Sequence, residues 1–283
     1  MTVPPPRRRF FAAMGFWLLA ALAPAAANAC GFESPCEVDA GFYLRRLPAG
    51  WDGRSPLPVV VFYHGYGASA AEVMGDSGLV AAISDLGAIL VAPDGIGNAW
   101  SFGAGGMPRA RDDVAFSAAV LDDLERRYPI DKTRILATGF SIGGSMTWWL
   151  ACNLPGRFAA FAPVAGAFWD PLPKDCPAGP VSIRHIHGTS DKTVPMKGRA
   201  IADGKFRQGD VMESWRRRKA WDGCAQKPDF ETAKDGLTCQ TWSAGSCTSG
   251  HAMELCLHPG EHEIEARWIA DGFRWMQGAA RAE

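Results

Sequence analysis

Short apolar runs rich in Val, Ile and Phe alternate with longer segments of helical period from about residue 41 to the end of the chain. Two of these runs, 59–63 and 88–92, have no polar face, as is typical of central strands that are buried on both sides. The alternation predicts an α/β fold in which helices flank a mostly parallel central sheet. We expect strands at 41–46, 57–63, 88–93, 134–140, 158–164, 181–187 and 252–258, and helices at 70–85, 111–127, 142–152, 208–221 and 263–277.

The first 29 residues have the pattern of an export signal peptide. Three arginines, Arg7 to Arg9, precede an apolar run at 10–22, and Ala27-Asn28-Ala29 forms a small-x-small cleavage site. Because the arginines also match a twin-arginine motif, the general secretory and twin-arginine routes both stay open. We therefore expect a secreted protein, extracellular or periplasmic, with residues 30–283 as a single mature domain.

All eight cysteines follow this segment. An even number of cysteines after an export signal indicates disulfides, here up to four. Spacing favours the local pairs Cys30 with Cys36 and Cys152 with Cys176. The last four crowd the final quarter of the chain without any CxxC pair, so we expect disulfides there rather than structural zinc, with the pairing left open: Cys224, Cys239, Cys247 and Cys256.

Charge and hydropathy exclude several classes of partner. The formal net charge is −1 and basic residues form no concentrated patch in the sequence, so we expect no nucleic-acid partner. The apolar run at 10–22 is shorter than the roughly 18 residues that a membrane span needs, and no other stretch reaches that length, so we expect no membrane-embedded body. We also expect a monomer.

The strongest chemical signal is Gly139-Phe140-Ser141-Ile142-Gly143, a GxSxG sequence between an apolar run and a helical segment. A strand followed by a tight turn and a helix is the setting of a nucleophile elbow, in which the serine hydroxyl is exposed on a strained turn. The alternative is a glycine-rich turn with a capping serine. We predict that Ser141 is a nucleophile.

A serine hydroxyl needs a base, and the base needs an orienting carboxylate. Asp191 lies in a turn-rich loop directly after one predicted strand, and His262 lies in a loop after another. The order Ser, Asp, His is the one that α/β-hydrolases use. His258 and His251 are weaker alternatives for the base, and a plain turn residue is the alternative for Asp191.

An oxyanion hole needs two N–H donors. The amide of Ile142 opens the helix after Ser141, and the amide of Tyr66 lies in the glycine-containing loop that follows the predicted strand 57–63. We predict these two donors. His64, in the same loop, is a candidate substrate contact, although a structural hydrogen-bonding role is the more ordinary reading.

Two tryptophans follow predicted strand ends, where open α/β sheets bind ligands. Trp100 and Trp169 are therefore candidate substrate-binding residues, with core positions as the alternative. Asp112 and Asp113 are interpreted as helix-capping charges rather than an acid/base pair.

Two pairs of histidines are spaced closely enough to raise the question of metal binding. His185 and His187 lie two apart on a predicted strand, and Pro259-Gly260 prevents His258 and His262 from sharing a helical face. We expect no metal and no other cofactor.

The run from Val59 to Val194 resembles the secreted esterase family that groups polyhydroxybutyrate depolymerases with bacterial and fungal feruloyl esterases. The matching elements are His64-Gly65, Ala92-Pro93-Asp94-Gly95, Asp112-Asp113-Val114-Ala115-Phe116, Gly139-Phe140-Ser141-Ile142-Gly143-Gly144, the run 158–166 and His187-Gly188-Thr189-Ser190-Asp191.

The resemblance implies an α/β-hydrolase fold with Ser141 as nucleophile, Asp191 as orienting acid and His262 as base. Many relatives have Gly-Gly-His-x-Trp-Pro around the base, whereas this chain has Gly260-Glu261-His262-Glu263-Ile264. It also implies a serine ester hydrolase without cofactor, acting on feruloylated plant polysaccharide such as xylan or on hydroxybutyrate-type esters. Polymer-degrading relatives often carry a linker and a surface-binding domain, which this chain lacks, so dense crystalline polyester is the less expected substrate.

Two other classes of function remain as alternatives. A peptidase of the prolyl-oligopeptidase type uses the same sheet and triad but normally has a large gating domain, for which this chain has no room. A non-catalytic binding protein on a hydrolase scaffold is the second alternative.

Overall fold

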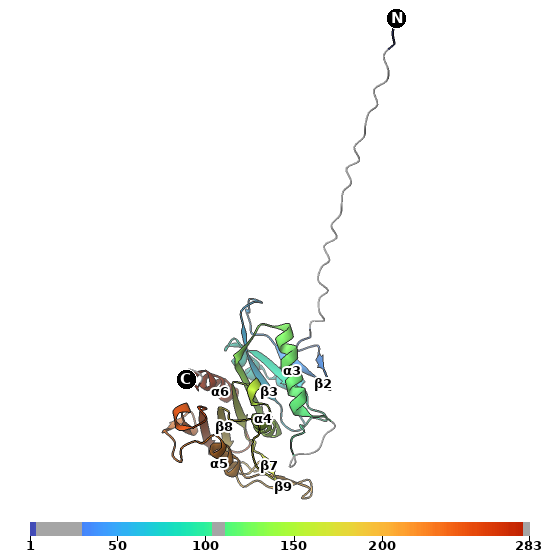
Figure 1. The fold of residues 1–283 in the computed structure, drawn as a ribbon. Helices are drawn as coiled ribbons and strands as arrows, with labels where there is room; N and C mark the ends of the chain where they lie inside the picture. The colour runs from blue at the N-terminus through green and yellow to red at the C-terminus, as the bar shows by residue number, and fades with distance from the viewer. Residues whose placement is uncertain (4–29, 104–110, 280–283) are drawn as a thin grey trace.

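In the computed structural model, which describes residues 1–3, 30–103 and 111–279, one large twisted sheet runs through the centre of the molecule (Figure 1). Its ten strands lie in the order β1-β2-β4-β3-β5-β6-β8-β13-β12-β11. The six strands from β4 to β13 in this order are parallel, and the outer pairs are antiparallel. The strands are β1 (Cys36–Val38), β2 (Gly41–Arg46), β3 (Leu57–Tyr63), β4 (Ile89–Pro93), β5 (Ile130–Phe140), β6 (Ala160–Val164), β8 (Ile183–Gly188), β11 (Phe230–Lys234), β12 (Leu237–Trp242) and β13 (Met253–His258).

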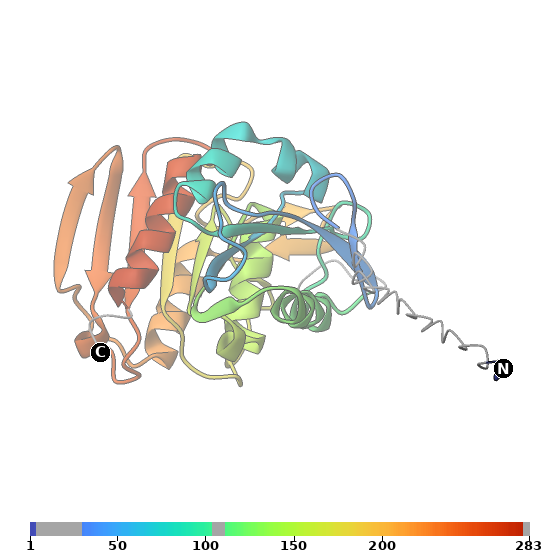
Figure 2. The same cartoon turned by 90° about the horizontal axis from the view of Figure 1, so that it is seen from above.

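Helices cover both faces of this sheet (Figure 2). One face packs against α1 (Ala70–Gly75), α2 (Ser77–Ser84) and α6 (Ala266–Ala279), and the other against α3 (Asp113–Arg127), α4 (Ile142–Asn153) and α5 (Val211–Trp221). Alternate residues of the buried strand β3 enter the two cores: Val59, Val61 and Tyr63 on one face, Val60 and Phe62 on the other. The expected fold class is therefore confirmed.

The predicted helix over 70–85 is two helices. Ser69 caps α1, and the Asp76 side chain accepts the Leu79 N–H at the start of α2, so the chain ends one helix and begins the next at Asp76. Among the interpreted capping charges, Asp112 does cap α3. Asp113 instead is buried, pairs with Arg111 at 2.6 Å and accepts the Ser101 N–H.

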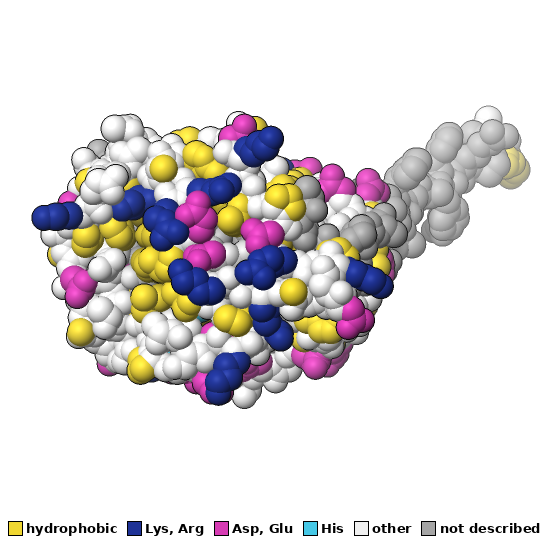
Figure 3. All heavy atoms as spheres, turned by 90° about the horizontal axis from the view of Figure 1, so that it is seen from below, with side chains coloured by type: hydrophobic (Ala, Val, Ile, Leu, Met, Phe, Trp, Pro, Cys, Tyr) yellow, Lys and Arg dark blue, Asp and Glu magenta, His cyan; other side chains and the backbone are white. Residues whose placement is uncertain are grey.

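Several strands were not predicted. The hairpin β11–β12 extends the sheet beyond β13, and β1 extends the opposite edge. A separate three-stranded sheet consists of β7 (Trp169–Asp170), β10 (Phe206–Gln208) and β9 (Ala200–Ile201), in that order. On the side of the molecule that carries β7 and β9, apolar surface lies between Lys and Arg side chains (Figure 3).

Four disulfides join the eight cysteines. Cys30–Cys36 and Cys152–Cys176 are the two local pairs that the spacing favours. The last four cysteines pair as Cys224–Cys247 and Cys239–Cys256, the second joining the neighbouring strands β12 and β13.

The predicted export signal spans residues 1–29, and residues 4–29 lie outside the described part of the chain. The signal therefore stays a prediction. None of the helices in the described ranges is both long enough and apolar enough to cross a bilayer.

Candidate active site

Ser141 lies in a strained turn between β5 and α4. Its φ of 60° and ψ of −120° place it outside the regions that L-residues ordinarily adopt, at a cost of about 1–3 kcal/mol. The turn is tight enough that a Cβ at Gly143 would collide with the carbonyl oxygen of Tyr63. The Ser141 N–H donates to the Val164 carbonyl at 3.0 Å, which ties the turn to the next strand. This is the geometry expected of a nucleophile elbow.

Asp191 and His262 meet although 71 residues separate them. His262 Nδ1 lies 2.7 Å from Asp191 Oδ2, while Asp191 Oδ1 accepts the amides of Thr193 and Val194, each at 2.8 Å. Burial raises the pKa of the Asp191 carboxyl, but the hydrogen bonds from His262 and Val194 and the nearby imidazole charges outweigh it, so that pKa lies below its ordinary value. Asp191 is therefore held as a carboxylate that orients the His262 ring.

The His262 ring lies beside the turn that carries the serine. It stacks at 4.6 Å between centroids on the ring of Phe140, the residue before Ser141. No hydrogen bond joins the Ser141 hydroxyl to His262 among the described contacts; such contacts are often long in ligand-free enzymes.

The two alternative bases lie elsewhere. His258 packs on Trp268 and approaches Glu263, and His251 contacts the Ser249 carbonyl. Of the three histidines, His262 is the one that hydrogen-bonds Asp191.

The two residues whose amides are predicted to bind the oxyanion, Ile142 and Tyr66, line the same cavity. The amide of Ile142 opens α4, where the first N–H groups have no acceptor within the helix. The amide of Tyr66 has no acceptor among the described residues, although Gly67 N–H donates to Asn98 O at 2.8 Å and fixes the loop. Ile142 and Tyr66 both line the cavity that contains Ser141. The arrangement is compatible with a two-donor oxyanion hole, which stays a prediction.

His64 and Trp100 support this loop instead of facing a substrate. The Gly95 N–H donates to His64 Nε2 at 3.0 Å, so the neutral ring carries its proton on Nδ1 and donates to Gly65 O at 2.9 Å. Burial lowers the pKa of His64, in keeping with a neutral ring. The Trp100 indole donates to His64 O at 2.9 Å, and its side chain has no exposed surface. The expectation of direct substrate contact is therefore wrong for Trp100, and for His64 the structural reading describes the ring.

A cavity of about 380 Å³ opens beside Ser141. Trp169 lines it, held by its indole N–H on Ser145 Oγ at 3.2 Å and by the Phe102 ring at 5.3 Å. Its place at the cavity agrees with the predicted position, and its contact with substrate stays a prediction. Other lining residues come from unpredicted elements or were not singled out: the Tyr66 side chain, Ser145, Thr193, Val194, Arg199, Ile201, Ala202 and Gln208.

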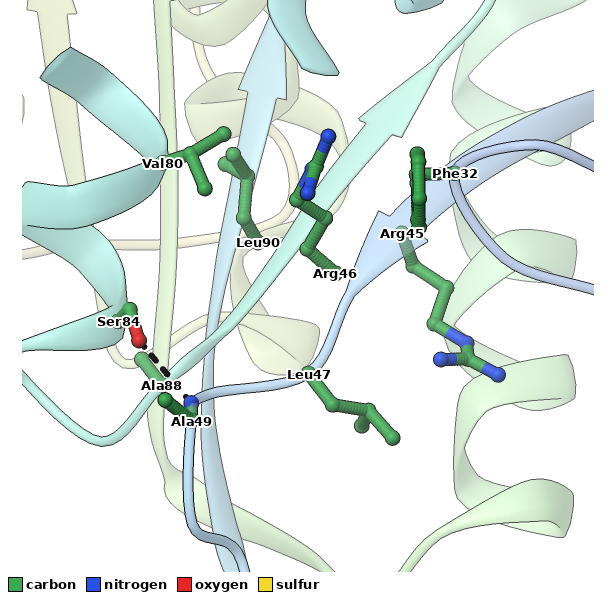
Figure 4. A pocket seen from close by; sticks show the side chains of 9 residues that line it. All are labelled: Phe32, Arg45, Arg46, Leu47, Ala49, Val80, Ser84, Ala88 and Leu90. Atoms are coloured by element: carbon green, nitrogen blue, oxygen red, sulfur yellow. Dashed lines mark hydrogen bonds between the residues drawn. The ribbon is translucent and has the colours of Figure 1, made fainter. Parts of the chain in front are cut away.

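A second cavity, of about 370 Å³, lies between β2, β4 and α2 (Figure 4). Arg46 packs against the Phe32 ring there at 3.9 Å, while Arg45 extends away from it toward Tyr128. Its described lining residues include neither a histidine nor a carboxylate, so the cavity beside Ser141 is the candidate active site.

One cluster of potential metal ligands occurs in the described part of the chain: Cys239, Glu254 and Cys256. The two sulfurs form a disulfide and are not thiolates, so this set does not fit a metal ion.

A mostly parallel sheet with helices on both faces and a strained serine turn after its central strand defines an α/β-hydrolase. Solved structures share the fold: an acetyl xylan esterase from Aspergillus awamori superposes with a TM-score of 0.58 at 16% identity, over 83% of this chain and 94% of that one. Residues 35–221 match the esterase family described as "Putative esterase", and the chain belongs to this family.

Curated relatives have similar sequences over part of their length. The "Putative esterase NocK" of Nocardia uniformis is 35% identical over 162 residues, 55% of this chain and 45% of that protein. Feruloyl esterase C of Emericella nidulans is 31% identical over 170 residues, 57% of this chain and 59% of that protein. The chain thus spans about half the length of these relatives.

Proposed function

We propose that this protein is a serine carboxylic ester hydrolase that acts through Ser141, His262 and Asp191. The observation that carries the proposal is the 2.7 Å contact between His262 and Asp191 beside the strained turn of Ser141. Membership of the esterase family supports the same reaction class.

In this mechanism His262 takes the Ser141 proton as the serine oxygen attacks the ester carbonyl. Asp191 keeps the His262 proton on Nδ1, which leaves Nε2 free to act as the base. The amides of Ile142 and Tyr66 bind the oxyanion, and each such donor contributes about 10²–10³ in rate. His262 then protonates the leaving alcohol. Water activated by the same ring releases the acid from the acyl-enzyme.

For the acyl group we propose an aromatic acid, with feruloylated plant polysaccharide as the substrate. The cavity beside Ser141 has aromatic walls, Trp169 and Tyr66, and apolar ones such as Val194 and Ile201. Its volume lies at the lower end of the range for small-molecule pockets, about 300–1,000 Å³. Relatives named as feruloyl esterases favour the same substrate over hydroxybutyrate esters.

We also propose that the enzyme is exported. The sequence pattern of residues 1–29 and the four disulfides support this, because such bridges persist mainly in oxidising compartments.

The test is ester turnover by Ser141→Ala compared with wild type and with Ser77→Ala, a control at an exposed serine of α2. We expect p-nitrophenyl butyrate turnover to disappear in Ser141→Ala and to persist in Ser77→Ala. Turnover that survives Ser141→Ala would remove the nucleophile assignment.

Substrates are then compared on the wild-type enzyme: methyl ferulate, feruloylated xylan fragments and hydroxybutyrate oligomers. Preference for hydroxybutyrate would contradict the proposed acyl group. Hydrolysis of prolyl peptides without ester turnover would support the peptidase alternative, and no turnover at all would support the binding-protein alternative.

A further inference from the structure

Two buried histidines lie directly behind the proposed triad and have no role in it. His185 and His187 are two residues apart on β8, so their side chains lie on the same face of the sheet. Both are fully buried. His185 Nε2 lies 3.2 Å from His187 Nδ1, so the two rings contact each other through nitrogen atoms.

The outer nitrogen of each ring faces an oxygen that can only accept a hydrogen bond. His185 Nδ1 lies 3.1 Å from the Pro163 carbonyl oxygen. His187 Nε2 lies 2.8 Å from the Val194 carbonyl oxygen and 3.6 Å from Asp191 Oδ2. Each outer nitrogen must therefore carry a proton, because otherwise a nitrogen lone pair would face an oxygen lone pair in a buried site.

The inner contact needs a proton as well. A hydrogen bond between His185 Nε2 and His187 Nδ1 requires one hydrogen between them, whereas two neutral imidazoles would have used both of theirs on the outer oxygens. Without a third proton, two lone pairs would face each other at 3.2 Å, a separation too short for a water molecule to lie between them.

We propose that His185 and His187 together hold three protons in the resting enzyme and so carry one positive charge against the inner side of Asp191. They are positioning residues: His187 lies 3.6 Å from Asp191 Oδ2, His185 acts on that carboxylate through His187, and neither lines the cavity beside Ser141. The proton count stands on the geometry alone, whereas its consequence for catalysis rests on the proposed function.

Opposing effects act on this charge. Burial is the largest effect and lowers the pKa of both rings. The His187 charge also lowers the pKa of His185, and the His262 and His258 rings lower the pKa of His187. The Pro163 carbonyl raises the pKa of His185, and the Val194 carbonyl and the Asp191 carboxylate raise that of His187. The pKa of each ring lies below its ordinary value, that of His185 well below it, so the proposed cation depends on the inner hydrogen bond, which a neutral pair cannot make.

The charge changes how Asp191 acts on His262. One Asp191 oxygen, Oδ2, faces both His262 and His187, so a cation on the inner side offsets part of the carboxylate's attraction for a proton on His262. Removing the cation therefore changes the interaction between Asp191 and the His262 ring, and the pH profile of kcat/KM reports that change.

The proton count is measured by NMR on the full-length enzyme labelled with ¹⁵N-histidine, at pH 7. Imidazole nitrogens with and without protons have well-separated ¹⁵N shifts, and the variants His185→Gln and His187→Gln assign the signals. We expect three of the four nitrogens of His185 and His187 to be protonated. The fourth nitrogen accepts the hydrogen bond between the two rings. Two neutral tautomers, with two unprotonated nitrogens, would overturn the proposal whether or not the enzyme hydrolyses esters.

The catalytic consequence is measured as the pH profile of kcat/KM for His185→Phe and His185→Leu, neither of which can accept a hydrogen bond from His187 Nδ1. We expect the midpoint of the acid limb to move upward by about one pH unit in both variants. If His185→Phe does not fold, His185→Leu, a smaller apolar side chain, gives the same readout. A uniform loss of activity with an unmoved midpoint would indicate a merely structural role and refute the electrostatic one. Ester turnover that persists in Ser141→Ala would instead refute the proposed function, but it would not affect the proposed number of protons on His185 and His187.

Discussion

The substitution Asp191→Asn tests the orienting carboxylate, because the surroundings dictate how an asparagine must lie. Asp191 Oδ1 accepts the amides of Thr193 and Val194, so the asparagine oxygen takes this place. Its NH₂ group then replaces Oδ2 and points at His262 Nδ1. Two donors cannot face each other, and the His262 proton therefore moves to Nε2, the atom that must accept the Ser141 proton.

A base held in the wrong tautomer lowers kcat by about 10⁴-fold, or about 5.4 kcal/mol of barrier. The assay is p-nitrophenyl butyrate hydrolysis from pH 6 to 9, with near-ultraviolet circular dichroism to verify folding. Asp76→Asn is the matched control, since asparagine caps a helix as well as aspartate does and α2 lies outside the site. A folded Asp191→Asn enzyme within tenfold of wild type would refute the assigned orientation of His262.

Three further predictions concern the wall of the cavity, one disulfide and the pH dependence of stability. Trp169→Ala removes one aromatic wall of the cavity, so KM for methyl ferulate should rise by about tenfold or more while KM for p-nitrophenyl acetate changes little; equal effects on both would contradict an acyl-binding role. Replacing both Cys239 and Cys256 by serine should lower the free energy of unfolding by about 2–5 kcal/mol in denaturant titrations, and an unchanged midpoint would show that this bridge is dispensable. The pKa of Asp191 in the folded state lies below its unfolded value, so the stabilisation by this carboxylate is present above about pH 4 and is lost as the pH falls through the folded pKa. The difference in melting temperature between wild type and Asp191→Asn should therefore shrink below about pH 4. A constant difference from pH 7 to pH 3 would disprove this linkage.

The central fold was predictable because its strands are buried on both sides. Runs such as 57–63 and 88–93 carry strong apolar signals, and the strands there match the expected bounds to within one residue. The break at Asp76 was missed because helical periodicity continues across it, although Ser69 and Asp76 are both capping residues. The hairpin β11–β12 also had a usable signal, the turn Asp235-Gly236, in which both residues have positive φ.

The small sheet that lines the cavity had no usable signal. Its strands have two or three residues, too few for any periodicity to show, and their pairing depends on tertiary contacts. Gln208 and Ile201 therefore could not be assigned to the site from sequence.

Side-chain direction explains the remaining difference at the site. The position of Trp100 after a strand end indicates a loop, which the structure confirms. The sequence does not indicate that the Trp100 indole points inward and donates to the His64 carbonyl. By contrast, chain order and strand ends sufficed to select Asp191 and His262, which the fold does bring together.

The most direct test of the central claim is mass spectrometry of the intact enzyme after reaction with a p-nitrophenyl alkylphosphonate, followed by peptide mapping. The account predicts one adduct per chain, located on Ser141, and abolition of labelling in Ser141→Ala. Labelling at another residue, or no adduct on a folded enzyme, would contradict it.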